Sequence, residues 1–172
     1  MNIVDQARKF AERAHRSQAR KYTGEPYFVH LDEVAKLCRR HGSGKPAIAA
    51  AYLHDVLEDQ PVTFEDLVGA FGPMVAGIVR ELTDMPASAG PRKQRKTADT
   101  ARLAIASASA QTIKCADLIS NTSSIVRHDP GFARTYLAEK RNLLPLLTRA
   151  IPTLKALAWE RLIQAESEIE RK

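Results

Sequence analysis

The segment His54-Asp55-Val56-Leu57-Glu58-Asp59 places four ionisable side chains within six residues. An imidazole nitrogen beside a carboxylate oxygen suits divalent ions such as manganese, iron or zinc. Two ligands do not complete a site, and His30 and Asp117 are candidates for the rest. Four such ligands leave coordination positions open for water and for a substrate oxygen. The residue types therefore predict a hydrolytic metal site.

These side chains need an element that directs them into one cavity. Pro46 suits the first turn of a helix, and we expect this helix to run to about Asp59. At roughly 100° per residue, the ionisable residues of the segment fall within about 140° of arc. Leu53, Val56 and Leu57 lie on the opposite side. One helix is therefore predicted to bury an apolar stripe and to present all four polar groups together.

The remaining chain predicts helices and no sheet. Apolar residues recur at helical spacing, and no segment alternates with period two. Further helices are expected over residues 2–18, from residue 29 to about 38, and over 63–71, 74–83, 92–106, 110–125, 130–147 and 152–168. Phe71-Gly72-Pro73 should interrupt this series, and Pro145 should kink or shorten its helix. We predict an all-α fold of about seven to nine helices.

Composition narrows the class of protein. Hydrophobic residues make up 44% and charged residues 27% of the 172 residues, as in a folded globular chain. We expect one domain over residues 1–172, with the motifs in residues 1–147 and a C-terminal helix at about 152–168. Cys38 and Cys115 form no CxxC pair, and neither a signal peptide nor a membrane span is visible, so a cytoplasmic protein is expected. The net charge of +6 favours an anionic partner without choosing among nucleic acid, a membrane surface and a phosphorylated metabolite.

The order of the candidate ligands resembles the H…HD…D signature of the HD phosphohydrolase superfamily. The flanking sequences narrow the resemblance to the hydrolase domain of RelA/SpoT alarmone enzymes and their single-domain relatives. The similar segments are residues 15–21, 24–30, 54–59 and 114–121. This resemblance implies an all-helical HD domain that binds one divalent ion, usually Mn²⁺, and removes pyrophosphate from the 3′ position of (p)ppGpp.

The resemblance also implies roles for single residues. The metal ligands are His30, His54, Asp55 and Asp117. Glu58 and Asp59 match the catalytic acidic pair that positions and deprotonates the attacking water. The substrate contacts are Arg20 and Lys21 at the base and phosphates, Arg92 at a phosphate, Asn121 and Ser124 at the ribose, and Tyr136 at the nucleotide.

Two alternatives stay open at the level of sequence. An HD phosphohydrolase acting on another nucleotide, such as an NADPH 2′-phosphatase or a nucleotidase, would use the same metal site. The Glu58-Asp59 pair favours the alarmone reaction, because many other HD nucleotidases lack it. A basic nucleic-acid-binding helical module would need no metal, but no helix-turn-helix or aromatic array supports it. We therefore expect a guanosine polyphosphate substrate and neither a nucleic-acid nor a membrane partner, with homo-oligomerisation left open.

Overall fold

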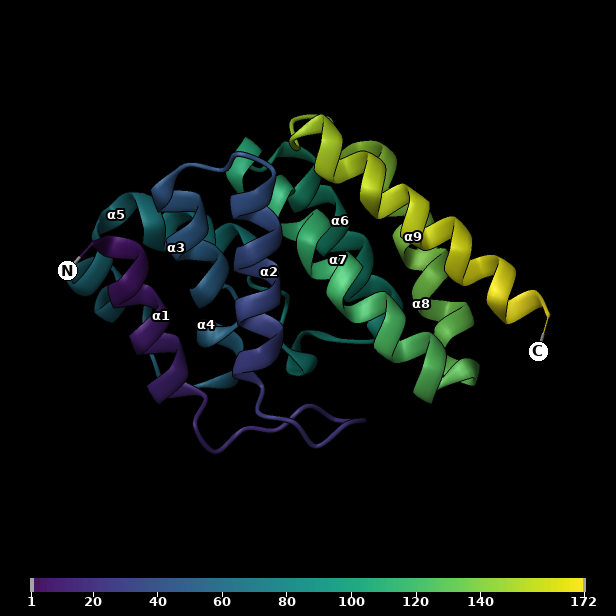
Figure 1. The fold of residues 1–172 in the computed structure, drawn as a ribbon, viewed down its shortest axis with the longest axis horizontal. Coiled ribbons are helices and arrows are strands. Elements are labelled where there is room, and N and C mark those ends of the chain that lie inside the picture. Colours follow the sequence, from purple (N-terminus) through teal and green to yellow (C-terminus); the bar gives the residue numbers. More distant parts are fainter. Residues whose placement is uncertain (1, 172) are drawn as a thin grey trace.

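A computed structural model describes residues 2–171, which fold into helices joined by loops (Figure 1). The helices are α1 (Ile3–Ala14), α2 (Phe28–Arg40), α3 (Lys45–Leu53), α4 (Val56–Asp59), α5 (Phe64–Leu82), α6 (Arg92–Ile105), α7 (Ala108–His128), α8 (Pro130–Leu143) and α9 (Pro152–Glu170), with 3₁₀ turns at Ala87–Ala89 and Leu144–Leu146. Within residues 2–171 the β pairing is a single antiparallel bridge between Ala19 and Pro26. The predicted all-α class is confirmed.

The segment with the four ionisable side chains departs from the prediction. A single helix from Pro46 to Asp59 is wrong, because α3 ends at Leu53 and α4 begins at Val56. The intervening Asp55 has φ −100° and ψ −1°, which lies in the sparsely occupied bridge region. The imidazole Nδ1 of His54 donates to the Ala51 carbonyl at 2.8 Å, so a side chain binds main-chain oxygen at the end of α3. Residues 54–55 and 58–59 therefore do not share one helix face.

The other predicted interruptions have clear causes. Gly72 has φ 80° and ψ 164° and divides α5, because this left-handed region favours glycine and Pro73 follows it. Pro145 lies in a 3₁₀ turn that follows the end of α8 at Leu143. The helix predicted over residues 2–18 is shorter than expected. It ends at Ala14, and the chain turns as the Gln18 N–H donates to the His15 carbonyl at 2.9 Å.

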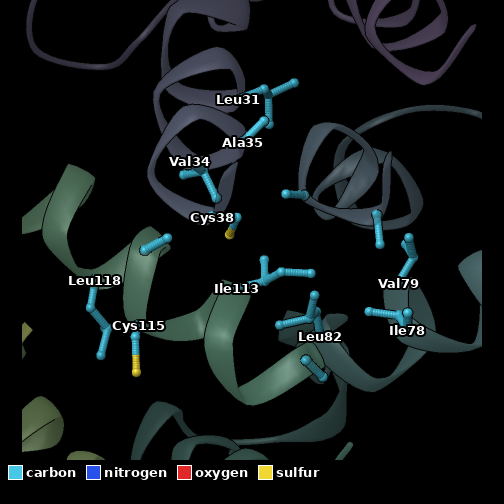
Figure 2. Packing of buried hydrophobic residues seen from close by; sticks show 14 of the residues in the cluster. Leu31, Val34, Ala35, Cys38, Ile78, Val79, Leu82, Ile113, Cys115 and Leu118 are labelled. Atoms are coloured by element: carbon cyan, nitrogen blue, oxygen red, sulfur yellow. The ribbon is translucent and has the colours of Figure 1, made fainter. Parts of the chain in front are cut away.

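The centre of the molecule is a hydrophobic core shared by α2, α3, α5 and α7. Figure 2 shows buried side chains of α2 facing those of α7 and α5, among them Val34, Ile113 and Leu82. Cys38 and Cys115 lie in this core, and burial raises the pKa of each thiol to about 12. Both cysteines are therefore neutral packing residues. No helix in residues 2–171 combines the length and apolar character needed to cross a membrane.

Candidate functional site

The four predicted metal ligands come together at one end of the core. His30 lies on α2, His54 and Asp55 lie in the turn between α3 and α4, and Asp117 lies on α7. The Nε2 atom of His30 is 3.4 Å from Asp117 Oδ1 and 3.6 Å from Asp55 Oδ2. The Nε2 atom of His54 is 3.8 Å from Asp117 Oδ1 and 3.1 Å from Asp55 Oδ2. One potential ligand atom each from His30, His54 and Asp117 lies within 4.8 Å of the others.

Hydrogen bonds fix which nitrogen of each imidazole faces this cluster. His54 Nδ1 contacts a carbonyl oxygen, which can only accept, so Nδ1 carries the proton. His30 Nδ1 lies 2.9 Å from the hydroxyl of Ser120, and that hydroxyl donates its single hydrogen to Glu33 Oε2 at 2.6 Å. Nδ1 of His30 is therefore also the donor. In the neutral imidazoles, both Nε2 atoms keep a free lone pair directed at the carboxylates.

A divalent ion fits this arrangement. Both Nε2 atoms are buried and make no hydrogen bond within residues 2–171. Buried polar atoms are almost always partnered, so two such atoms beside two carboxylates indicate a cation site. Burial by itself lowers the pKa of His54, but Asp55 and Asp117 outweigh it and raise that pKa well above its usual value. The same negative potential favours a divalent cation, whose binding displaces the proton.

The two carboxylates are held in place by neighbouring donors. Asp117 Oδ2 accepts from the Lys114 ammonium at 2.9 Å, and its Oδ1 accepts from Asn121 Nδ2 at 2.6 Å. Burial would raise the pKa of Asp117, but the Lys114 charge and the imidazoles hold it well below its usual range. Asp55 Oδ2 accepts from the Tyr27 hydroxyl at 2.6 Å. Both aspartates are therefore ionised and oriented.

Glu58 lies beside this cluster on the wall of a polar cavity of about 160 Å³, which Asp55, Asp117 and Asp84 also line. Its Oε1 accepts from the Asp84 N–H at 2.7 Å. The side chain keeps access to water, yet partial burial and the Asp55 charge raise the pKa of Glu58 to about 7. A carboxylate with this pKa can accept a proton near neutral pH.

Asp59 lies elsewhere, and the expectation that it shares a face with Glu58 is wrong. It is exposed, it does not line the polar cavity, and its Oδ2 accepts from Gln18 Nε2 at 2.8 Å. Gln18 in turn contacts His15 Nδ1 at 2.6 Å and Gln60 Nε2 at 2.6 Å. Adjacent residues of a helix point about 100° apart, so within α4 Glu58 lines the polar cavity while Asp59 binds Gln18 and anchors the chain after α1.

The predicted substrate residues fall into two adjoining cavities. Arg20, Lys21, Asn121 and Ser124 line a cavity of about 260 Å³, whereas Arg92 and Tyr136 line the polar cavity with the metal cluster. Asn121 and Tyr27 line both cavities, so the two spaces meet there. Arg92 is engaged with Glu139, to which its Nε and Nη2 donate at 3.0 and 2.8 Å.

Sequence reasoning missed several residues of these cavities. Tyr22 and Phe132 add aromatic rings to the larger cavity, and Asp84 and Lys140 line the polar one. Asp84 gave no signal, because it lies in a loop without a motif. Lys140 could have been found, since its spacing places it in the apolar stripe of its helix, where a charged side chain is unusual.

An all-helical fold that gathers two histidines and two aspartates beside a polar cavity defines a metal-binding domain of the hydrolytic type. The chain belongs to the HD domain family, whose pattern matches residues 7–140. Guanosine-3′,5′-bis(diphosphate) 3′-pyrophosphohydrolase MESH1 of Drosophila melanogaster is 34% identical over 125 residues, which are 71% of this chain and 69% of that protein. MESH1 of Danio rerio is 35% identical over 124 residues, which are 70% of this chain and 68% of the relative.

Longer proteins and solved structures extend the comparison. A probable chloroplastic GTP diphosphokinase of Arabidopsis thaliana is 30% identical over 149 residues, and this match spans 81% of the chain but 21% of the plant protein. The solved structure of a metazoan ortholog of SpoT that hydrolyses ppGpp has a TM-score of 0.85 and 27% identity, covering 95% of this chain and 96% of its own. The fold and the sequence thus lead to the same group of relatives.

Proposed function

We propose that this protein hydrolyses the 3′-diphosphate of guanosine alarmones, converting ppGpp or pppGpp and water into GDP or GTP and pyrophosphate. The observation that carries the proposal is the pair of buried imidazole Nε2 atoms, without hydrogen bonds, that face Asp55 and Asp117 on the wall of a polar cavity. The similarity to the two MESH1 proteins, which extends over two thirds of each, supports the choice of substrate.

The metal proposed for this site is Mn²⁺, held by His30, His54, Asp55 and Asp117. Mixed nitrogen and carboxylate ligands suit this ion, while soft thiolate ligands, which would favour zinc or copper, are absent from this group of four. When bound, such an ion lowers the pKa of water and offsets the negative charge of a phosphate. Ser120 and the Ala51 carbonyl hold the imidazoles in the tautomer that this binding requires.

Glu58 is the proposed general base. Its carboxylate takes a proton from the attacking water, whose oxygen forms a bond to the phosphorus nearest the ribose. The bond from that phosphorus to the 3′ oxygen breaks, and the 3′ oxygen leaves as a hydroxyl by taking up the proton that Glu58 accepted from the water. Tyr27 keeps Asp55 oriented, and Asp59 supports the site from its rim through Gln18. This division of labour gives Glu58 the larger catalytic role and Asp59 a positioning one.

The larger cavity is proposed to bind the nucleoside. Tyr22 and Phe132 offer ring faces for stacking a base, as aromatic side chains do for nucleobases in other proteins. Arg20 and Lys21 supply positive charge near the 5′ phosphates, and Asn121 and Ser124 supply polar groups for the ribose. Because this cavity meets the polar one at Asn121, a bound nucleoside can direct its 3′ substituent toward the metal cluster.

The decisive experiment compares two substrates with the Mn²⁺-loaded protein. We expect pyrophosphate release from ppGpp and little phosphate release from NADPH, together with one tightly retained metal ion per chain after purification. Glu58→Gln should keep the metal and lose turnover by about 10²–10⁴-fold. The matched control is Glu65→Gln, which changes an exposed glutamate on α5 and should leave turnover unchanged. Faster release from NADPH, or full activity of Glu58→Gln, would refute the corresponding assignment.

A further inference from the structure

Lys140 on α8 is a buried cation that forms no ion pair with the described residues 2–171. Its residue exposure is 8%, and its side chain lines the polar cavity. No carboxylate lies within ion-pair distance of its ammonium among residues 2–171, and its one polar contact is with the ring of Tyr136, whose centroid is 4.8 Å from Nζ. Lysine is almost never buried without a partner, because removing an ammonium from water is costly. A position of this kind calls for an anionic ligand.

The other cations of the polar cavity are already paired. Arg92 forms two hydrogen bonds with Glu139, and Lys114 binds Asp117 at 2.9 Å. Lys96 is paired with Asp84 and lies 3.6 Å from Asp99. Of the four cations lining the cavity, Lys140 alone can therefore bind a substrate anion without first breaking an ion pair of the described structure. Burial and the Lys114 charge lower the pKa of Lys140 to about 8, and a bound anion would raise it again.

The cavities follow one another in a fixed order. The nucleoside cavity shares Tyr27 and Asn121 with the polar cavity. The polar cavity shares Asp84, Lys96, Lys114 and Lys140 with a small recess beyond it, and the recess has no residue in common with the nucleoside cavity. None of the four metal-cluster residues lines the recess. Lys140 therefore stands at the end of the polar cavity that is remote from the nucleoside.

We infer that Lys140 binds the terminal phosphate of the 3′-diphosphate and thereby selects diphosphate over monophosphate substrates. This inference rests on the proposed function. A nucleoside 3′-diphosphate has its groups in the same order as the cavities: nucleoside, reacting phosphate, terminal phosphate. With the reacting phosphorus beside the metal cluster and Glu58, the terminal phosphate extends toward Lys140. A 3′-monophosphate has no group to reach it.

The test measures specificity with Lys140→Met, which keeps the length of the side chain and removes its charge. Loss of a charge-assisted hydrogen bond should reduce kcat/KM for ppGpp by about 10- to 100-fold. Affinity for guanosine 5′-diphosphate 3′-monophosphate, measured as a competitive inhibition constant, should change by less than about threefold. Lys140→Arg should restore much of the ppGpp activity. Arg134→Met is the matched control, because it removes an exposed positive charge from the same helix.

Stability supplies a second and independent measurement. If the role of Lys140 is to bind substrate, its replacement by an apolar side chain should leave the melting temperature unchanged or raise it, because a buried charge is removed. A lower melting temperature, or equal loss of both nucleotides, would overturn the inference while leaving the proposed hydrolysis intact. Failure of the unsubstituted protein to hydrolyse ppGpp would instead overturn the proposed function, and the inference with it.

Discussion

Ser120 provides a sharp test of the metal site, because it touches no substrate cavity and acts only through His30. Its hydroxyl accepts from His30 Nδ1 at 2.9 Å and donates to Glu33 at 2.6 Å. Ser120→Ala removes this link and leaves a buried N–H without a partner, and the imidazole loses the bond that keeps Nε2 directed at the carboxylates. Removing an orienting partner of a metal-binding histidine typically weakens metal affinity about 10- to 100-fold. We expect the same here, corresponding to about 1.4–2.7 kcal/mol.

The assay is a competitive chelator titration of Mn²⁺ binding, with circular dichroism to verify the fold. Ser120→Thr keeps the hydroxyl and should retain most of the affinity, and Ser123→Ala removes an exposed hydroxyl from the same helix as a control. Glu33→Gln keeps an acceptor for Ser120 but removes its charge, so an intermediate loss is expected. A folded Ser120→Ala protein that binds Mn²⁺ within twofold of the original affinity would refute the reasoning about the imidazole tautomer.

Three further predictions concern the base, the metal and the core. The ionised form of Glu58 is the active one, and the pKa of this carboxyl is raised to about 7, so log kcat/KM should fall with unit slope as the pH is lowered. The inflection should lie at or below pH 7, because a bound cation lowers the pKa of Glu58. This acid limb of the pH profile should be absent in Glu58→Gln. Chelation should lower the melting temperature by about 5–10 °C relative to protein held at 100 times the metal dissociation constant, and calorimetry before and after Mn²⁺ is restored measures this shift. Leu53→Ala opens a cavity beside His54 and should lower the free energy of unfolding by about 2–5 kcal/mol, measured by urea titration. Ile163→Ala, which changes an exposed side chain, should lower it by less than about 0.5 kcal/mol. Equal losses of stability in the two variants would contradict the assigned core.

Sequence reasoning succeeded where side-chain chemistry and helical period carry the information. The all-α class follows from apolar spacing, while the order of histidines and aspartates predicts the four metal ligands, whose side chains lie close together. The break at His54-Asp55 was missed, because periodicity cannot register an imidazole that binds a main-chain carbonyl. Asp59 was expected to share a face with Glu58, although adjacent helical residues point about 100° apart and Asp59 binds Gln18 outside the polar cavity. The role of Lys140 was missed because it depends on which other cations are paired, and the Glu139 partner of Arg92 comes from a distant segment.

Packing between α2 and α7 is what connects stability to chemistry in this protein. His30 and Asp117 are far apart in sequence, but the helices that carry them pack together. Val34 and Cys38 lie one and two turns after His30, and Ile113 lies one turn before Asp117; all three are buried in the core. The rigid core therefore fixes the separation of the two ligands, and the short hydrogen bonds of Ser120 and Asn121 add only orientation. Interiors of this density shift little when a cation binds. The cluster must accordingly be close to its binding geometry before the metal arrives, with Lys114 holding Asp117 in its ionised form meanwhile.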